Sequence, residues 1–301
     1  MLAALSINWQ TITDGVALGA IYALMAVGIG LVFGVLRLVN FAYGQLIMAG
    51  AFALALASQW NWPVWAGILL CFAVVLVLSL LMERLVFRPL RTQPPAVMLV
   101  ATFAVAFLLQ NIALLWFGAL GKIAVSLASL NRPVTISGVD VRKITIVAVA
   151  VTVVCLLALV LLLERTSIGL HMRASSMDFS TARLLGVRAN RVIAVAVLIS
   201  GFLAATAAVL LTVQTPLVTS DFALSDTILV LAGVVLGGLN NLVPATLGGF
   251  AIGFASGLLG GALPSNQSQY IPTFLFVAVI VVLLLRPSGL FTRSGQAVER
   301  L

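Results

Sequence analysis

Apolar residues dominate this chain in long runs that short polar stretches separate. A helix needs about 20 consecutive apolar residues to cross the roughly 30 Å hydrocarbon core of a bilayer. Runs near that length lie at about 12–36, 62–82, 96–117, 144–163, 191–213 and 271–285. The pattern therefore predicts an all-α polytopic membrane protein, a single transmembrane domain over 1–301, in which each run is a membrane-spanning helix.

Two further apolar regions depart from this regular pattern. Residues 45–59 are short for a span, and 227–261 is interrupted by Asn240, Asn241 and Pro244. We therefore expect short or broken helices near 37–59 and 227–261. Depending on whether these regions cross fully, the total is eight or nine transmembrane segments, which leaves the side of the N-terminus open.

The two irregular regions are also the candidates for a solute pathway. In transporters, interrupted apolar segments at matching places in the two halves tend to line the substrate path, because a broken helix exposes N–H groups that can bind polar groups. The residues that we assign to a translocation pathway on this basis are Asn40, Phe41, Tyr43, Gly44, Gln45, Asn240 and Asn241. The alternative is that small residues only allow close helix packing. We favour packing for the glycines at 248, 249, 253 and 257.

The polar segments predict which loops face which side of the membrane. The longest, 164–191, holds five arginines, and clustered basic residues beside apolar segments mark cytoplasmic loops. The basic loop 83–95 and the C-terminus go to the same side. The segment 118–143 is then extracytoplasmic, although its four basic residues weaken the asymmetry. Within it, 134–141 alternates around a glycine, which predicts a small hairpin.

Inside the loop 164–191, the sequence indicates a helix of two turns. Asp178 is a candidate N-cap, and Gly186 is a candidate left-handed residue at its end. Phe179, Ala182 and Leu185 then share one face, with Arg183 off it. So short a helix is marginal alone in water. It is expected to fit a groove on a cytoplasmic partner, the alternative being a loop that packs on its own protein.

Composition supports the membrane assignment and excludes several classes of function. The chain is 62% hydrophobic and 8% charged, with a mean hydropathy of +1.23, far outside the soluble range. Its net charge of +8 is distributed over loops between apolar runs, which predicts membrane lipid and no nucleic acid as its surroundings. Cys71 and Cys155 lie inside apolar runs, so neither a disulfide nor a metal site is expected.

No motif for catalysis is found, and we expect no catalytic residue and no enzyme activity. A GxxxxGK[ST] phosphate-binding loop is absent from the sequence, so ATP is not expected to be hydrolysed by this chain. The acids Asp14, Glu83, Glu164 and Asp226 all fall at the ends of predicted segments. A proton-coupled carrier usually needs an ionisable group inside the membrane, so that class is disfavoured.

Several motifs together resemble the permeases of branched-chain amino-acid ABC importers, the LivH type. They include 15–24 (GVALGAIYAL), 39–44 (VNFAYG), 83–91, 173–187, 235–238 (VLGG) and 286–291 (RPSGLF). The resemblance covers nearly the whole chain. It implies an inner-membrane subunit that moves an amino acid inward by alternating access, without a cofactor of its own.

The resemblance also implies the partners. These are a second related permease or another copy of this chain, two cytoplasmic ABC ATPases that bind ATP and magnesium, and an extracytoplasmic solute-binding protein. It assigns ATPase coupling to Asp178, Phe179, Ala182, Arg183, Leu184, Leu185 and Gly186.

Substrate identity is less constrained by the resemblance. Family members commonly carry His and Glu where Tyr43 and Gln45 stand. Import of urea or short amides is therefore the alternative within this class. An autonomous channel or a secondary transporter is the alternative outside it.

Overall fold

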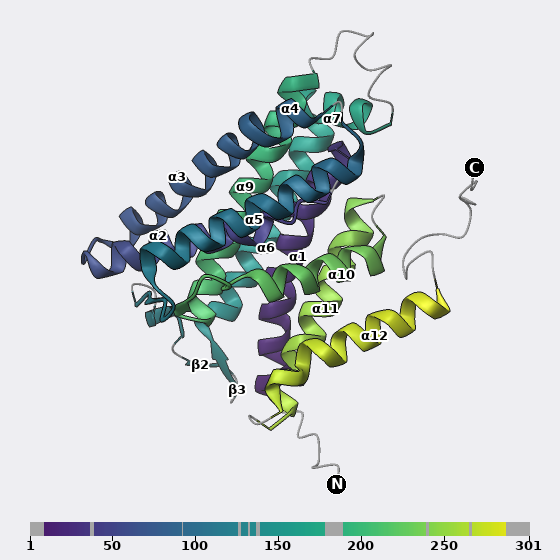
Figure 1. The fold of residues 1–301 in the computed structure, drawn as a ribbon. Helices are drawn as coiled ribbons and strands as arrows, with labels where there is room; N and C mark the ends of the chain where they lie inside the picture. Colours follow the sequence, from purple (N-terminus) through teal and green to yellow (C-terminus); the bar gives the residue numbers. More distant parts are fainter. Residues whose placement is uncertain are drawn as a thin grey trace.

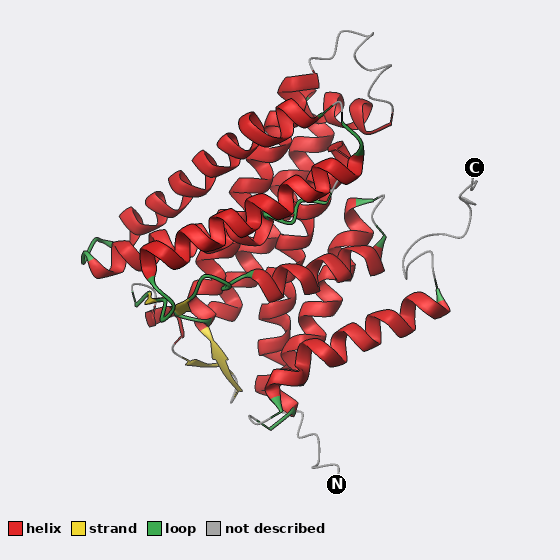
Figure 2. Cartoon of the chain, in the orientation of Figure 1, coloured by secondary structure: helices red, strands yellow, loops and turns green. Residues whose placement is uncertain are grey.

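The architecture was analysed in a computed structural model (Figure 1), which describes residues 9–36, 39–91, 93–125, 128–131, 133–136, 139–177, 189–238, 241–264 and 267–286. Helices dominate it (Figure 2). The helices on which the fold depends are α1 (Trp9–Leu36), α2 (Tyr43–Gln59), α3 (Val64–Met82), α4 (Arg88–Leu90), α5 (Pro95–Phe117), α6 (Lys143–Arg165), α7 (Ser167–Met177), α9 (Ala189–Gln214), α10 (Leu224–Gly237), α11 (Leu242–Ala262) and α12 (Ile271–Leu285).

All six predicted spans are confirmed, as α1, α3, α5, α6, α9 and α12. With α11, seven helices of the described chain are long and apolar enough to cross a membrane. The 17 residues of α2 and the 14 of α10 are shorter. The expectation of short or broken helices is thus confirmed: α2 is short but regular, and the 227–261 region divides into α10 and α11.

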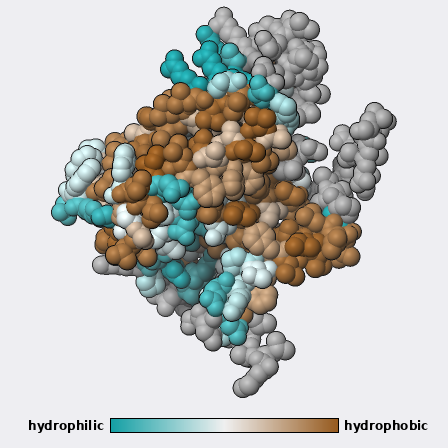
Figure 3. Space-filling view, in the orientation of Figure 1, coloured by the Kyte–Doolittle hydropathy of each residue, from teal (hydrophilic) through white to brown (hydrophobic). Residues whose placement is uncertain are grey.

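Helix α1 forms the centre of the bundle, and the other helices surround it (Figure 1). Its side chains are buried along most of its length, and α9 is also largely buried. In contrast, most residues of α3, α5, α6 and α12 are not buried by the rest of the protein. Hydrophobic residues accordingly cover most of the visible surface, with hydrophilic ones gathered towards its ends (Figure 3). An apolar exterior of this kind matches a lipid environment.

The contact between α1 and α11 is the most extensive in the bundle, and it depends on glycines. A Cβ added to Gly253 would lie 2.7 Å from the carbonyl oxygen of Leu18 and 2.8 Å from Cα of Gly19. Only a residue without a side chain allows two helix backbones to come this close. The packing interpretation of the glycines in 248–257 agrees with this geometry.

Short β segments lie at one end of the bundle. The hairpin predicted over 134–141 is confirmed: β2 (Pro133–Ile136) pairs antiparallel with β3 (Val139–Arg142). Arg142 forms an ion pair of 2.8 Å with Asp14, which ties the hairpin to the start of α1. A second ribbon joins β1 (Lys122–Ile123) to β4 (Leu217–Val218).

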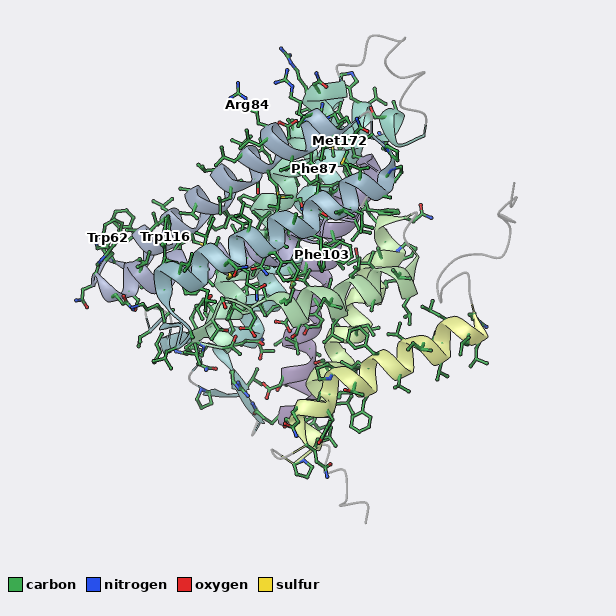
Figure 4. All side chains as sticks on the ribbon, viewed as in Figure 1. Trp62, Arg84, Phe87, Phe103, Trp116 and Met172 are labelled. Atoms are coloured by element: carbon green, nitrogen blue, oxygen red, sulfur yellow. The ribbon has the colours of Figure 1, made fainter. Side chains whose placement is uncertain are left out.

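The two ends of the bundle differ in chemistry. The labelled Trp62 and Trp116 lie at one end of the α3–α5 pair, and Arg84 lies at the other (Figure 4). Exposed tryptophans are typical of a membrane–water interface, and arginines are typical of the cytoplasmic end. We call the latter the basic end, defined by Arg84, Arg88, Arg91, Arg165 and Arg286.

The basic end also carries a helix that the sequence pattern did not predict. Within the expected loop 164–191, residues Ser167–Met177 form α7, which contacts α6, α9 and α1. The side chain of Met172 is buried there (Figure 4). The predicted coupling helix, from Asp178 to Gly186, lies outside the described residues.

Candidate translocation site

A cavity of about 220 Å³ lies between α1, α2, α5 and α10, beside the non-helical turn 39–42. Its apolar lining comes mainly from Ile29, Phe41, Phe103, Phe107, Ile228 and Leu231. Its polar lining comes from Asn40, Gln45, Gln110 and Thr227. None of the described residues that line it carries a formal charge. Concave, mostly apolar sites with a few polar groups are typical of small-molecule binding.

The turn before α2 is built around Asn40, whose side chain is buried. Its Oδ1 accepts a hydrogen bond of 3.0 Å from the backbone N–H of Ala42, and its carbonyl oxygen accepts one of 3.3 Å from Tyr43. Asparagine suits such turns because its side chain can bond the backbone two residues on. The chain therefore breaks between α1 and α2 without leaving these groups unpaired.

The expected free N–H groups at this helix start are largely used within the protein. The N–H groups of Gln45 and Leu46 both donate to the carbonyl oxygen of Ala42 at 3.1 Å, and that of Phe41 lies 3.5 Å from Oγ1 of Thr102. The N–H groups of Ala42 and Tyr43 donate to Asn40, so few backbone donors at this helix start remain for a solute. Side chains, more than the backbone N–H groups that the sequence pattern predicted, are therefore available to bind a solute in this cavity.

Gly44 has a packing role next to the cavity. A Cβ at this position would lie 2.9 Å from the carbonyl oxygen of Ala223 and still closer to Oγ1 of Thr227. The glycine thus brings the start of α2 against the start of α10. The Thr227 hydroxyl donates 2.7 Å to the carbonyl oxygen of Ala223, so it is already paired.

The predicted pathway residues are only partly brought together. Asn40, Phe41 and Gln45 line the cavity. The Tyr43 hydroxyl instead lies against α1, where a Cβ on Gly28 would overlap it. Asn241 is exposed before α11 and is not among the lining residues, and Asn240 lies outside the described residues.

The sequence analysis missed the contribution of α5 and α10 to the cavity. Gln110 was a detectable signal, because it is one of two adjacent amides inside the apolar run 96–117. Nothing in the local pattern distinguished Thr227, or Phe103, which lies on α5 and is about half exposed (Figure 4). These residues meet the turn 39–42 only through tertiary packing.

A partly buried acid lies beside this site, at a helix end as the sequence analysis expected. The Tyr22 hydroxyl donates a 2.6 Å hydrogen bond to Oδ1 of Asp226. Asp226 does lie in the first turn of α10, yet Tyr22 lies midway along α1. Residues 215–223, which precede α10, are not helical, and Thr215, Leu217 and Asp221 among them are exposed. The hydrogen bond therefore ties the start of α10 to the middle of α1.

The basic end holds a second polar connection. Glu83 begins a π-helix (Glu83–Phe87) and forms an ion pair with Arg91, which also donates to Oδ1 of Asn190 in α9. Burial lowers the pKa of Arg91, and the neighbouring Glu83 opposes that shift. Segments of π-helix often occur at functional sites. The connection links α3 to the residue that closely follows the predicted coupling helix.

Comparison with known proteins reveals close relatives. The family described as branched-chain amino acid transport system, permease component, matches residues 11–285. The chain is 29% identical over 298 residues to the high-affinity branched-chain amino acid transport system permease protein BraD of Pseudomonas aeruginosa. This match covers 94% of this chain and 95% of BraD. It is 28% identical over 299 residues to the corresponding permease LivH of Escherichia coli K12, with coverage of 94% and 95%.

A solved structure shares the fold. It is described as an inward-facing conformation of a metal-chelate type ABC transporter, and it is similar with a TM-score of 0.55 over 94% of this chain and 88% of that chain. The sequence identity is 16%, so this likeness concerns the fold alone.

Proposed function

This chain belongs to the family of branched-chain amino acid transport system permease components, and we propose that it is the membrane-spanning subunit of an ABC importer for these amino acids. The relatives are named as permeases for branched-chain amino acids over nearly their full length, which favours this substrate class over urea or short amides. The proposed activity is passage of the solute by alternating access, and the energy comes from ATP hydrolysed elsewhere.

The observation that carries the proposal, beside family membership, is the uncharged cavity between α1, α2, α5 and α10, which is open on the side of Phe103, Phe107 and Ile228. Three of the predicted pathway residues, Asn40, Phe41 and Gln45, line it. An apolar lining favours aliphatic side chains, because burying apolar surface is favourable by about 25 cal/mol per Å². The absence of charge among the described lining residues disfavours a route for ions.

Orientation follows from the charges at the two ends. We place the basic end, and with it the C-terminus, in the cytoplasm, and the end with the hairpin β2–β3 outside. The helices alternate in direction along the chain, so the N-terminus is then extracytoplasmic. The protein is accordingly a multi-pass protein of the cell inner membrane.

The partners follow from the same proposal. Two ABC ATPases bind ATP and magnesium and dock at the basic end, a second permease completes the pathway, and an extracytoplasmic binding protein delivers the solute. We assign ATPase docking to 178–186. Asn190 follows this segment closely in the chain, and its contact with Arg91, which pairs with Glu83, connects it to the end of α3. No ATPase site is assigned to this chain.

The decisive experiment is reconstitution of the complete transporter in proteoliposomes. ATP should drive uptake of leucine, isoleucine and valine when the binding protein is present, and a mutation in the ATPase Walker motif should abolish uptake. Uptake that needs no ATP would support an autonomous channel or a secondary transporter. Uptake of urea without uptake of leucine would support the amide alternative.

Coupling can be tested separately with Leu185→Asp. A carboxylate placed in an apolar contact without a partner is costly enough to prevent docking. The permease should insert normally, while the ATPase subunits fail to co-purify and solute-stimulated ATP hydrolysis disappears. Normal association and transport by this variant would show that 178–186 is an ordinary loop.

A further inference from the structure

Arg91 connects the ends of three helices at the basic end of the bundle. Its Nη2 pairs with Oε1 of Glu83, where α3 passes into the π-helix, and its Nη1 donates to Oδ1 of Asn190 in the first turn of α9. Helix α5 begins at Pro95, shortly after Arg91. A planar guanidinium carries several donors in a fixed fork, so it can hold two oxygen acceptors at once. The side chain therefore fixes the start of α9 against the segment between α3 and α5.

The two contacts of Arg91 differ in their exposure to water. The side chains of Arg91 and Glu83 are only 13% and 11% exposed, and removing one member of a buried ion pair is strongly destabilising. Asn190 is exposed. Glu83 thus anchors the guanidinium, and less conformational entropy is lost when the anchored side chain also bonds Asn190. The bond to Asn190 is the one that can form and break without unfolding the bundle.

The π-helix Glu83–Phe87 helps the ion pair to form. Residues eight apart on a regular α-helix are about 12 Å apart along its axis. In a π-helix the hydrogen bonds run from i to i+5, so each turn holds more residues and the segment is shorter. Phe87 is buried in the hydrophobic core, which fixes this segment to the bundle. Arg91 is thereby brought back towards Glu83.

Both sides of the Arg91 contact lead to the cavity. Helix α9 is largely buried and packs against α1, α2 and α3. Helix α5 contacts α2 and the π-helix, and it lines the cavity with Phe103, Phe107 and Gln110. A displacement of the start of α9 would thus reach one wall of the cavity through Arg91.

We propose that Arg91 is a positioning residue that makes the start of α9 and the segment leading into α5 move as one unit when the transporter binds and hydrolyses ATP. Asn190 transmits the movement, and Glu83 holds Arg91 in place for it. This inference rests on the proposed function and names the contact that couples ATP hydrolysis to movement of the cavity wall.

The main test compares Asn190→Ala with Asn190→Asp in the complete transporter in proteoliposomes. Asn190→Ala keeps the buried ion pair and removes only the acceptor on α9. The ATPases should still co-purify with unchanged basal hydrolysis, whereas hydrolysis stimulated by leucine-loaded binding protein should fall about tenfold, because a hydrogen bond to a charged group is lost. Asn190→Asp keeps the acceptor and should retain the stimulation. A purely structural role would lower basal and stimulated hydrolysis together.

Two further variants test the fork and the charge. Arg91→Lys keeps a positive charge beside Glu83 but replaces the fork with a single ammonium, so it should lose stimulation as Asn190→Ala does. Glu164→Gln is the control, because it removes an exposed carboxylate near the end of α6, at the same end of the bundle. It should be stimulated as the wild type is.

A distance measurement tests the shared movement directly. Spin labels are placed at Leu85 and Arg191, which are both exposed, in a variant without Cys71 and Cys155. The distance between the labels should be the same without nucleotide and with a nonhydrolysable ATP analogue. Asn190→Ala should broaden its distribution. A distance that changes with nucleotide while Asn190 is present would overturn the proposal.

The outcomes separate the Arg91 contact from the function on which it rests. ATP-driven leucine uptake by the wild type, together with full stimulation in Asn190→Ala and Arg91→Lys, would overturn the role of Arg91 alone. A wild-type complex that hydrolyses ATP and moves no amino acid would instead overturn the proposed function, and the spin-label distances would still test whether the two helix ends move together.

Discussion

Two interrupted apolar stretches look alike in the sequence and are used in opposite ways by the fold. The stretch 39–59 begins with a turn and lines a cavity through Asn40, Phe41 and Gln45. The helix α11, after the second interruption, packs against α1 through glycines, with none of its residues among those that line the cavity. We call the α1–α11 contact the closed seam and the contact of α2 with α5 and α10 the open seam.

The difference shows what a small-residue pattern means in each setting. In the closed seam, glycines recur at 249, 253 and 257, four residues apart, so they form one stripe along one helix face. In the open seam, the single Gly44 allows close approach while polar side chains flank it. A stripe of small residues therefore indicates packing, and a small residue among buried amides indicates a candidate solute path.

The largest effect is expected from filling the closed seam. In Gly253→Val, the new side chain would meet the backbone of Leu18 and Gly19 at under 3 Å, and backbone cannot move aside cheaply. Overpacking typically costs about 1–3 kcal/mol, and a β-branched residue against backbone belongs at the top of that range or beyond. The yield of folded protein, measured by size-exclusion chromatography in detergent, should fall sharply.

Gly260→Val is the control for this change. A Cβ there would meet only Cδ1 of Ile271, at 3.9 Å, an ordinary contact distance. Its folded yield should match the wild type. Equal losses in both variants would mean that glycine in α11 is needed for something other than the closed seam.

The next effect separates stability from transport in the open seam. Ala106 on α5 is buried and lines the cavity, so the added atoms of Ala106→Leu have space to enter. Because these atoms enter the cavity and not a packed core, the free energy of unfolding should change by less than the roughly 1–3 kcal/mol that overpacking usually costs. ATP-driven leucine uptake should nevertheless drop at least tenfold. Unchanged uptake by the Ala106→Leu variant would mean that the solute does not pass through this cavity.

Much of the fold was predictable because hydrophobic length is a strong signal in membrane proteins. No irregular, lipid-exposed backbone is tolerated inside the bilayer, so the apolar runs had to be helices. The break between α10 and α11 and the hairpin β2–β3 were also predicted, because asparagine, proline and glycine interrupt the sequence pattern there. The helix α7 was not, because its 11 residues are polar enough to resemble a loop.

The candidate site was predictable only where it is local in sequence. The turn 39–42 can be predicted from the sequence around Asn40. The residues that α5 and α10 add to the cavity depend instead on which helices pack next to each other. The position of Asp226 shows the same limit. Its hydrogen-bond partner Tyr22 is 204 residues away in the chain, so no local pattern around Asp226 could reveal the contact.

The Tyr22–Asp226 hydrogen bond joins the two seams, since α1 belongs to the closed seam and α10 to the open one. Tyr22→Phe removes the donor and leaves the buried carboxyl group without this bond, so the free energy of unfolding should fall by about 1–3 kcal/mol. Denaturant unfolding in detergent measures the loss. Tyr43→Phe is the matched control: its hydroxyl has no partner within the described residues, so its removal should be neutral or stabilising.

The smallest expected effect is a difference in chemical reactivity, measured in a variant without Cys71 and Cys155. If the open seam is wet, a cysteine at Gln110, which lines the cavity, should react with small water-soluble thiol reagents and should be protected by leucine. Cysteine at Tyr43 should not react, because that side chain is fully buried against α1. Val77 is exposed on the apolar face of α3 and should be inert as well, because lipid keeps the thiol from water. The thiolate is the reactive form and a thiol needs water to ionise, so reactivity reports hydration rather than exposure alone.

Equal inertness of Gln110→Cys and Val77→Cys in every nucleotide state would mean that the open seam is dry. The two seams would then differ only in packing density.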